Sequence, residues 1–464
     1  MNNFRKNQLN LEKESIKKLL IQMSVPMILA MLINGLYYLA DAVFVGWGVG
    51  GQALGGLAVV FPLQMLAIAL GMAIGIGSAS LVSVALGNHD RQEASTVINT
   101  AVGLCIILGI ILPVLLLTFQ KQVLGLFGVT PAIYKYASGY YSYIVYGFIF
   151  ILLSFLGTNT IKAEGNAHLA AVGMLLGSLL NIIFDPIFIF GFNMGTEGAA
   201  LATVLARALT TIYLAYYYLS GHSVVAISKS VRYWDHRIVK KIGSLGIGVF
   251  LNQIGFSLLA MGMNLSLRYY GGFMDIAVYG VISRIYVFMT LPFLGLAQGV
   301  QPIIGYNYGA RKIEHIRETL KLALQLSFLM GGVLFIILML FPQQVLNLFT
   351  RDSAIINRGI LPLRIMTLMA PLIGIQIISY LFFLSIKQPM KGLLISLSRQ
   401  TLFTLPLVII MPLIMGKMGI WLAYPVADIL AVGLSVYLIT QEINRLTGTY
   451  MPITQSFYQV RSIK

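Results

Sequence analysis

Residues 195–206 read GTEGAALATVLA and residues 416–427 read GKMGIWLAYPVA, so five identities recur at one constant spacing, the interval from Gly195 to Gly416. A second set of identities recurs at nearly the same spacing, the interval from Gly77 to Gly299. It consists of Gly77, Gly87, Leu126, Phe127, Ala132 and Ile133, which recur as Gly299, Gly309, Leu348, Phe349, Ala354 and Ile355. The chain therefore contains two copies of one unit. Duplicated apolar halves are typical of secondary transporters, in which two similar bundles alternate about a central site.

Composition sets the class of protein. Of the 464 residues, 58% are hydrophobic and 10% are charged, against roughly 25% charged in soluble domains. The apolar runs, at about 20 residues each, are long enough to cross a bilayer as helices. The sequence predicts an all-α polytopic membrane protein with twelve transmembrane helices in two six-helix repeats. Their expected positions are 20–46, 53–84, 96–119, 137–159, 168–191, 196–219, 242–267, 275–303, 318–341, 359–384, 393–414 and 418–440.

The distribution of basic residues predicts the topology. Lysines and arginines are concentrated in the N-terminal tail and in residues 220–241 and 306–321, whereas residues 47–52 contain none. The positive-inside bias then places both termini in the cytoplasm. Six spans per half give both copies the same orientation, related by a pseudo-two-fold axis along the membrane normal. The expected division is an N-terminal lobe, a cytoplasmic linker, a C-terminal lobe and a cytoplasmic tail, at 1–225, 226–235, 236–445 and 446–464.

Several partners and activities are not expected. The net charge of +16 lies in short loops beside the spans, so it reflects topology and not a nucleic-acid partner. The sequence has no metalloprotease, P-loop or nucleophile-elbow motif, so neither an enzyme nor a cofactor is expected. Without an ATP-binding module, uphill transport requires an ion gradient. A monomer in the plasma (inner) membrane, in contact with the lipid bilayer and with small organic substrates, is expected.

Two acidic residues inside the spans predict a cation-coupling site, because a charge in hydrocarbon must be paired, hydrated or neutralised. Asp41 and Asp185 each lie six residues before the expected end of an outward-running span, roughly 9 Å deep. Asn181 lies one turn from Asp185, and Thr203 lies at a similar depth in the next span. These four residues form an all-oxygen set that suits a hard cation such as Na⁺. A close carboxylate pair could carry H⁺ instead. Helix packing is the alternative role for both carboxylates.

Other candidates rest on weaker patterns. Asn34 and Tyr38 precede Asp41 at helical spacing, so they form a polar stripe that could line a cavity or join helices. Arg284 and Gln376 are the other candidate lining residues, and Pro26 is a candidate hinge in the first span. Arg207 and Asp428 occupy equivalent repeat positions, at the same interval as Gly195 and Gly416, and a structural pair is one interpretation.

Four stretches together resemble the multidrug and toxic compound extrusion (MATE) family. They are DAVFVGW at 41–47, LGN at 86–88, NIIFDPIFIFG at 181–191 and QPIIGYNY at 301–308. The resemblance implies a V-shaped fold of two lobes that exports amphipathic, often cationic compounds in exchange for H⁺ or Na⁺. It is closest to the DinF-like prokaryotic branch.

That resemblance also implies roles for particular residues. Asp41, Asn181, Asp185 and Thr203 match the cation site of the N-terminal lobe, with Asp41 as protonation switch and Pro26 as bend point. The seventh and tenth spans contain no acidic residue, unlike those of the other bacterial branch. A flippase for a lipid-linked or oligosaccharide substrate is the alternative function in the same superfamily, and a channel or membrane enzyme is the alternative outside it.

Overall fold

The computed structural model describes residues 11, 14–49, 51–126, 129, 131–225 and 234–448. Within those ranges the side chains of residues 38–43, 45–56, 58–59, 132–133 and 273 are not described. The described part of the chain consists of helices joined by short turns and loops and contains no strand, which confirms the expected all-α class.

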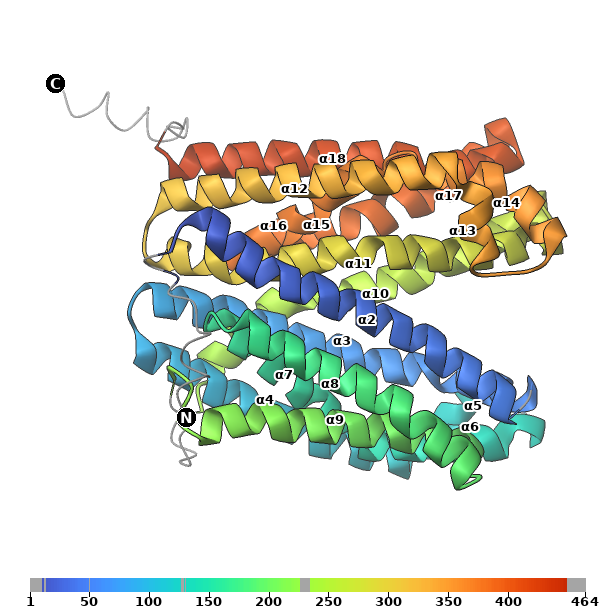
Figure 1. Ribbon diagram of the computed structural model, residues 1–464, viewed down its shortest axis with the longest axis horizontal. Helices are drawn as coiled ribbons and strands as arrows, with labels where there is room; N and C mark the ends of the chain where they lie inside the picture. Colours follow the sequence, from blue (N-terminus) through green and yellow to red (C-terminus); the bar gives the residue numbers. More distant parts are fainter. Residues whose placement is uncertain are drawn as a thin grey trace.

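Each half of the chain supplies one series of helices (Figure 1). The first series is α2 (Ile16–Val49), α3 (Gly51–Gly87), α4 (Arg91–Thr118), α5 (Gln120–Leu126), α6 (Pro131–Tyr146), α7 (Phe148–Ala163), α8 (Ala167–Pro186), the π-helix η1 (Ile187–Gly191) and α9 (Gly195–Leu219). The second is α10 (His236–Tyr270), α11 (Phe273–Gly309), α12 (Ile313–Leu340), α13 (Pro342–Asn347), α14 (Ser353–Met366), α15 (Ala370–Ser385), α16 (Pro389–Leu397), the π-helix η3 (Ser398–Thr404), α17 (Leu405–Met415) and α18 (Lys417–Leu446).

The helices account for the twelve expected spans. Ten candidate spans, eight of them single helices and two continuing through a π-helix, are long and apolar enough to cross a bilayer, and two bent pairs raise the number to twelve. The pairs are α6 with α7, bent by 48°, and α14 with α15, bent by 54°. Each pair is the fourth span of its half, where the sequence predicts one straight helix. In the first half the break falls at Gly147, whose missing side chain leaves room for Val204 of α9. In the second half, Pro371 at the start of α15 favours a new helix.

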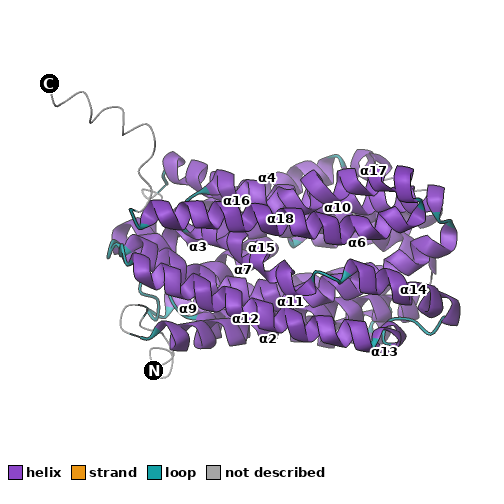
Figure 2. Ribbon diagram, turned by 90° about the horizontal axis from the view of Figure 1, so that it is seen from above, coloured by secondary structure: helices purple, strands orange, loops and turns teal. Residues whose placement is uncertain are grey.

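The helices run lengthwise in one elongated bundle (Figures 1 and 2). The first turn of α2 and the last turn of α18 lie at the same end, on the left of Figure 1, which we call the terminal end. The turns that join α3 to α4 and α11 to α12 also lie there, and we call the opposite end the distal end. In that view α2 crosses between the helices of the two halves.

The two halves meet backbone to backbone near the terminal end. A Cβ on Gly77 of α3 would lie 2.6 Å from the carbonyl oxygen of Ile242 in α10. A Cβ on Gly299 of α11, the repeat equivalent of Gly77, would lie 2.6 Å from the Cα of Ser24 in α2. Small residues allow helices to pack this closely in membranes. The second helix of each half therefore packs on the first helix of the other half, as a two-fold relation between the repeats requires.

Candidate functional site

Three of the four expected coupling residues form one buried cluster in the first half. Asn181 and Asp185 lie one turn apart on α8, and Thr203 lies on α9 beside them. With the Asn181 amide oriented to suit both neighbours, its nitrogen donates to Asp185 Oδ2 at 3.1 Å. Its oxygen accepts from the hydroxyl and the backbone N–H of Thr203, each at 3.1 Å. Asp185 is 0% exposed, so its carboxylate lies in the interior of a membrane span.

The local sequence widens the helix next to this cluster. Pro186 follows Asp185 directly and has no N–H to donate, so the regular helical hydrogen bonding is interrupted there. The chain continues as the π-helix η1 from Ile187 to Gly191. Single π-turns occur often at functional sites, because they redirect backbone groups and side chains. Residues 181–191, which suggested a site in the sequence, therefore contain both Asp185 and the π-helix η1.

Helix α2 lies along α8, and Asn34, the first residue of its expected polar stripe, contacts α8. The hydroxyl of Ser178 on α8 lies 3.2 Å from Asn34 Oδ1 on α2 and donates to it. Both helices run from the terminal end toward the distal end (Figure 1). Asp41 follows Asn34 by seven residues, and Asp185 follows Ser178 by seven. Tyr38 and Asp41 belong to α2, but their side chains lie outside the part of the chain that the structure describes.

Pro26 lies inside α2, which continues through it as one helix. The neighbouring backbone is held by the other half of the chain. A Cβ on Gly295 of α11 would lie 2.5 Å from the Cα of Ile28. The Ser24 hydroxyl donates to the carbonyl oxygen of Leu296 at 3.5 Å. The segment of α2 around the proline is thus seated on α11, whereas the segment beyond Asn34 lies along α8.

The remaining candidates lie apart from this cluster. Gln376, 6% exposed, donates from Nε2 to the carbonyl oxygen of Ile395 at 2.9 Å, which joins α15 to α16. Arg284 is exposed on α11. Arg207 lies over the Phe155 ring at 5.3 Å. Asp428 pairs with Arg399, so Arg207 and Asp428 do not form the pair that their equivalent positions suggested.

Two buried cations were missed at the level of sequence. Lys162 of α7 is 0% exposed, and its Nζ donates to Asn159 Oδ1 at 3.0 Å and to Gln298 Oε1 at 3.3 Å. Since Gln298 belongs to α11, this contact joins the two halves. Arg399 of η3 is 12% exposed and donates to Asp428. A lysine or arginine inside an apolar run was the signal that could have identified both.

The fold and the cluster define a class of protein. Two repeated six-span halves, with a buried acidic site in one of them, are the architecture of a secondary transporter.

The chain belongs to the MatE family, that is, to the MATE transporters: the family model matches it twice, at residues 26–187 and 249–410. The interval between the starts of the two matches is close to the repeat read from the sequence. The multidrug export protein MepA of Staphylococcus aureus (strain N315) is 28% identical over 437 residues, 92% of this chain and 95% of that protein.

Solved MATE structures have the same fold. A multidrug resistance MATE family transporter of the MOP superfamily, in an outward-facing conformation, superposes with a TM-score of 0.90 at 26% identity, over 95% of this chain and 99% of that one. A MATE in a bent conformation superposes with a TM-score of 0.88 at 26% identity, over 97% of this chain and 99% of that one.

Proposed function

We propose that this MATE transporter is a multidrug exporter that exchanges amphipathic or cationic organic compounds for H⁺ or Na⁺ by alternating access. The observation that carries the proposal is the fully buried Asp185, which is hydrogen-bonded to Asn181 inside a span. The coupling site consists of Asp41, Asn181, Asp185 and Thr203. The protein is expected in the plasma membrane with both termini in the cytoplasm.

Asp41 completes the site through the register of α2 on α8. From the contact between Asn34 and Ser178, Asp41 and Asp185 are each seven residues further on, which is roughly 10 Å along either helix. This register supports an equal depth for the two residues in the proposed site. Two carboxylates at one depth in hydrocarbon repel each other, so the site binds a proton or a small cation to remove the excess charge.

The donor atoms fit either coupling ion. Carboxylate, amide and hydroxyl oxygens are ligands that Na⁺ accepts, as other hard cations do. The amide of Asn181 can reverse its orientation, and then it offers its oxygen to the ion instead of its nitrogen to Asp185. If the driver is H⁺, the proton on one carboxyl group hydrogen-bonds to the other carboxylate.

Occupation of the site changes the shape of α2. Pro26 leaves the carbonyl oxygen of Gln22 without its helical donor, so a bend there loses no hydrogen bond. The segment before the bend is held on α11 by Ser24 and Gly299. The segment beyond Asn34, which lies along α8, moves relative to α8 when the charge between the two helices is neutralised. Drug and cation then favour opposite shapes of one cavity, which is the condition for exchange.

Transport in proteoliposomes with separately imposed pH and Na⁺ gradients tests the proposal. Asp185→Asn keeps the shape of the side chain and removes its charge, so gradient-driven export should be lost while the protein remains folded and inserted. The matched control is Asp352→Asn at the exposed start of α14, where Asn also caps a helix. Full gradient-driven export by Asp185→Asn would place the coupling site elsewhere.

The flippase alternative requires cations that are free to bind an anionic head group. The chain offers Arg284 and Arg207 for this role, and Arg207 lies over an aromatic ring, so too few cations remain to favour a flippase. This arrangement favours the exporter.

A further inference from the structure

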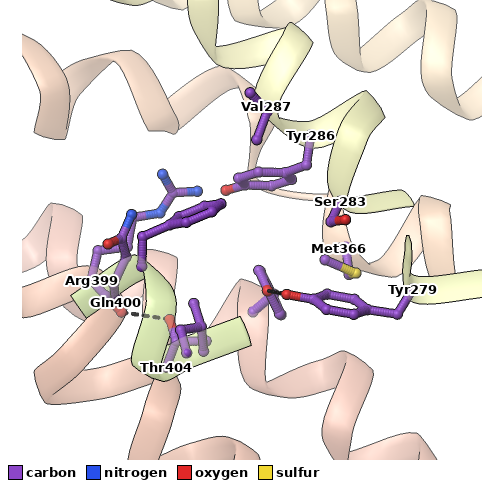
Figure 3. A pocket seen from close by; sticks show the side chains of 11 residues that line it. Tyr279, Ser283, Tyr286, Val287, Met366, Arg399, Gln400 and Thr404 are labelled. Atoms are coloured by element: carbon purple, nitrogen blue, oxygen red, sulfur yellow. Dashed lines mark hydrogen bonds between the residues drawn. The ribbon is translucent and has the colours of Figure 1, made fainter. Parts of the chain in front are cut away.

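The second half of the chain contains a small cavity, mostly apolar with one polar side, between α10, α11, α14, η3 and α18 (Figure 3). Its volume is about 30 Å³. Tyr279, Tyr286 and Tyr424 supply an aromatic wall, and Arg399 and Gln400 supply a polar one. Phe256 and Val287 also line it and are 42% and 41% exposed, so they mark its mouth.

Arg399, which lines the polar wall, belongs to an incomplete ion pair with Asp428 of α18. Arg399 Nε donates to Asp428 Oδ1 at 2.7 Å, but Arg399 Nη2 and Asp428 Oδ2 have no partner among the described residues. The guanidinium also lies over the Tyr286 ring at 5.0 Å, as Figure 3 shows. Arginine and carboxylate often pair through two parallel hydrogen bonds. Here only one of the two bonds is made.

Two more polar atoms of the wall are also buried without a partner in the described part of the chain. They are the hydroxyl oxygen of Tyr286, a residue that is 9% exposed, and Gln400 Oε1. A buried polar group without a hydrogen bond typically costs about 1–3 kcal/mol. Several such groups in one cavity indicate a site that is completed by a ligand. The π-helix η3, which contains Arg399 and Gln400, is the kind of backbone irregularity that often accompanies such sites.

The charge of the site selects the ligand. Arg399 and Asp428 neutralise each other, so an added anion or cation would leave a net charge in a buried place. An uncharged group that both accepts and donates suits the available atoms: it accepts from Arg399 Nη2 and donates to Gln400 Oε1. A carboxamide does both with one planar group.

The size of the cavity limits what enters. A volume of about 30 Å³ holds one small polar group and not a whole drug, since a single water molecule needs about 10–15 Å³ of such space. The body of the ligand therefore lies at the mouth against Phe256 and Val287. The Tyr286 and Tyr424 rings, with centroids 5.8 Å apart, form the edge on which an aromatic body packs.

The geometry points to a second binding site in the C-terminal half, at Tyr286, Arg399 and Gln400, that holds the uncharged carboxamide or hydroxyl end of an aromatic compound. The repeat equivalent of Tyr424 in the first half is Thr203, at the same interval that relates Gly416 to Gly195. The two halves thus use equivalent places for different ligands. The inference goes beyond the proposed coupling and does not require it.

Equilibrium binding to the purified full-length protein tests this site with three probes of one shape. Benzamide is uncharged, benzoate is an anion and benzamidinium is a cation. We expect benzamide to bind, and both charged probes to bind roughly tenfold or more weakly, as buried net charge is costly. No binding of benzamide, which would leave a cavity for water only, overturns the proposal. A charged probe that binds as well as benzamide also overturns it.

Variants connect the binding to these residues. Arg399→Met with Asp428→Leu removes both charges together, which avoids a lone buried ion, and benzamide affinity should fall roughly tenfold or more. Tyr286→Phe keeps the ring and removes one hydroxyl, so it remains informative if the double variant does not fold; about a fivefold loss is expected. The control is Arg364→Met, at an exposed arginine. It should bind benzamide as the unaltered protein does, and unchanged affinity in Tyr286→Phe and in the double variant contradicts the assignment.

Discussion

Gly87 of α3 and Gly309 of α11 occupy equivalent positions in the two repeats, and each abuts the backbone of the other half. A Cβ on Gly87 would lie 2.0 Å from the carbonyl oxygen of Tyr306, and a Cβ on Gly309 would lie 2.2 Å from that of Val84. Val84 and Tyr306 are themselves repeat equivalents, at the same interval as the two glycines. The pseudo-two-fold rotation therefore exchanges the Gly87–Tyr306 contact with the Gly309–Val84 contact. Its axis passes between the two glycines.

Gly87→Ala should prevent the two halves from closing at the terminal end. Real Cβ atoms do not approach a carbonyl oxygen to 2.0 Å, so α3 and α11 must separate. We call the contact between α3 and α11 at the terminal end the seam. Export in proteoliposomes should fall roughly tenfold or more, if the closed seam is destabilised by about 1.4 kcal/mol or more. Gly332→Ala in α12, where a Cβ meets nothing within 4 Å, is the matched control. Equal export by the two variants would show that this seam does not need to close.

Thr203→Val should alter the ion dependence of export and leave the fold intact. Valine has the shape of threonine but cannot donate to Asn181, so the cluster at Asp185 loses one bond of about 1 kcal/mol. We expect the concentration of coupling ion at half-maximal export to shift roughly fivefold. Thr203→Ser retains the hydroxyl and should restore the original value.

The control for this prediction lies on the same helix. Thr210 Oγ1 donates to the carbonyl oxygen of Ala206 within its own helix, at 2.8 Å. Thr210→Val should therefore leave the ion dependence unchanged. An equal shift in Thr203→Val and Thr210→Val would mean that the effect comes from the packing of α9 and not from the cluster.

The sequence was sufficient to predict the fold, because the apolar span lengths and the internal repeat can both be recognised in the sequence itself. Span length follows from the thickness of the bilayer, and equivalent positions such as Gly77 and Gly299 revealed the symmetry. The bends inside the fourth span of each half were not predictable. They depend on contacts with other helices, such as the approach of Val204 to Gly147.

Three residues of the candidate site were predicted because their depth and helical spacing are local properties of α8 and α9. The pairing of Arg399 with Asp428 was not predicted, because the two residues are 29 positions apart on different helices. Repeat symmetry pointed to Arg207 instead, but symmetry relates places in two lobes and does not bring them together. Partners across a lobe require the packed structure.

Glu164 should make the stability of the protein depend on pH. It lies between α7 and α8, outside the spans, and burial raises the pKa of its carboxyl group to about 7. Its oxygens accept from the Ser223 hydroxyl at 2.8 Å, from Tyr217 at 3.0 Å and from the Val224 N–H at 3.1 Å. The group therefore ties the end of α9 to the turn before α8.

The sign of this dependence follows from the raised pKa. The folded state holds the proton above the ordinary pKa of 4.5 and releases it near 7, so its stabilising contribution is complete below 4.5 and is lost as the pH rises through 7. The unfolding midpoint should fall between pH 5 and pH 8 by more in the unaltered protein than in Glu164→Gln. Parallel curves for the two proteins would show that Glu164 keeps one protonation state throughout. Glu14→Gln, at an exposed surface pair, is the control.

Lys162 should limit how firmly the two halves hold together at the terminal end. Its ammonium group is 0% exposed, and the acceptors it contacts, Asn159 Oδ1 and Gln298 Oε1, are uncharged amide oxygens. A buried cation costs several kcal/mol, which two neutral hydrogen bonds offset only in part. Separation of α7 from α11 would return the ammonium to water, so the lysine favours opening of the seam.

Lys162→Met retains the length of the side chain and removes the charge, and it should therefore stabilise the closed seam. We expect a higher unfolding midpoint together with slower turnover in proteoliposomes. Each transport cycle must separate α7 from α11, and the variant stabilises their contact. Lys162→Arg keeps the charge and should not raise the midpoint. A Met variant with a lower midpoint and unchanged turnover would mean that Lys162 only fills and bonds the interior, with no part in opening.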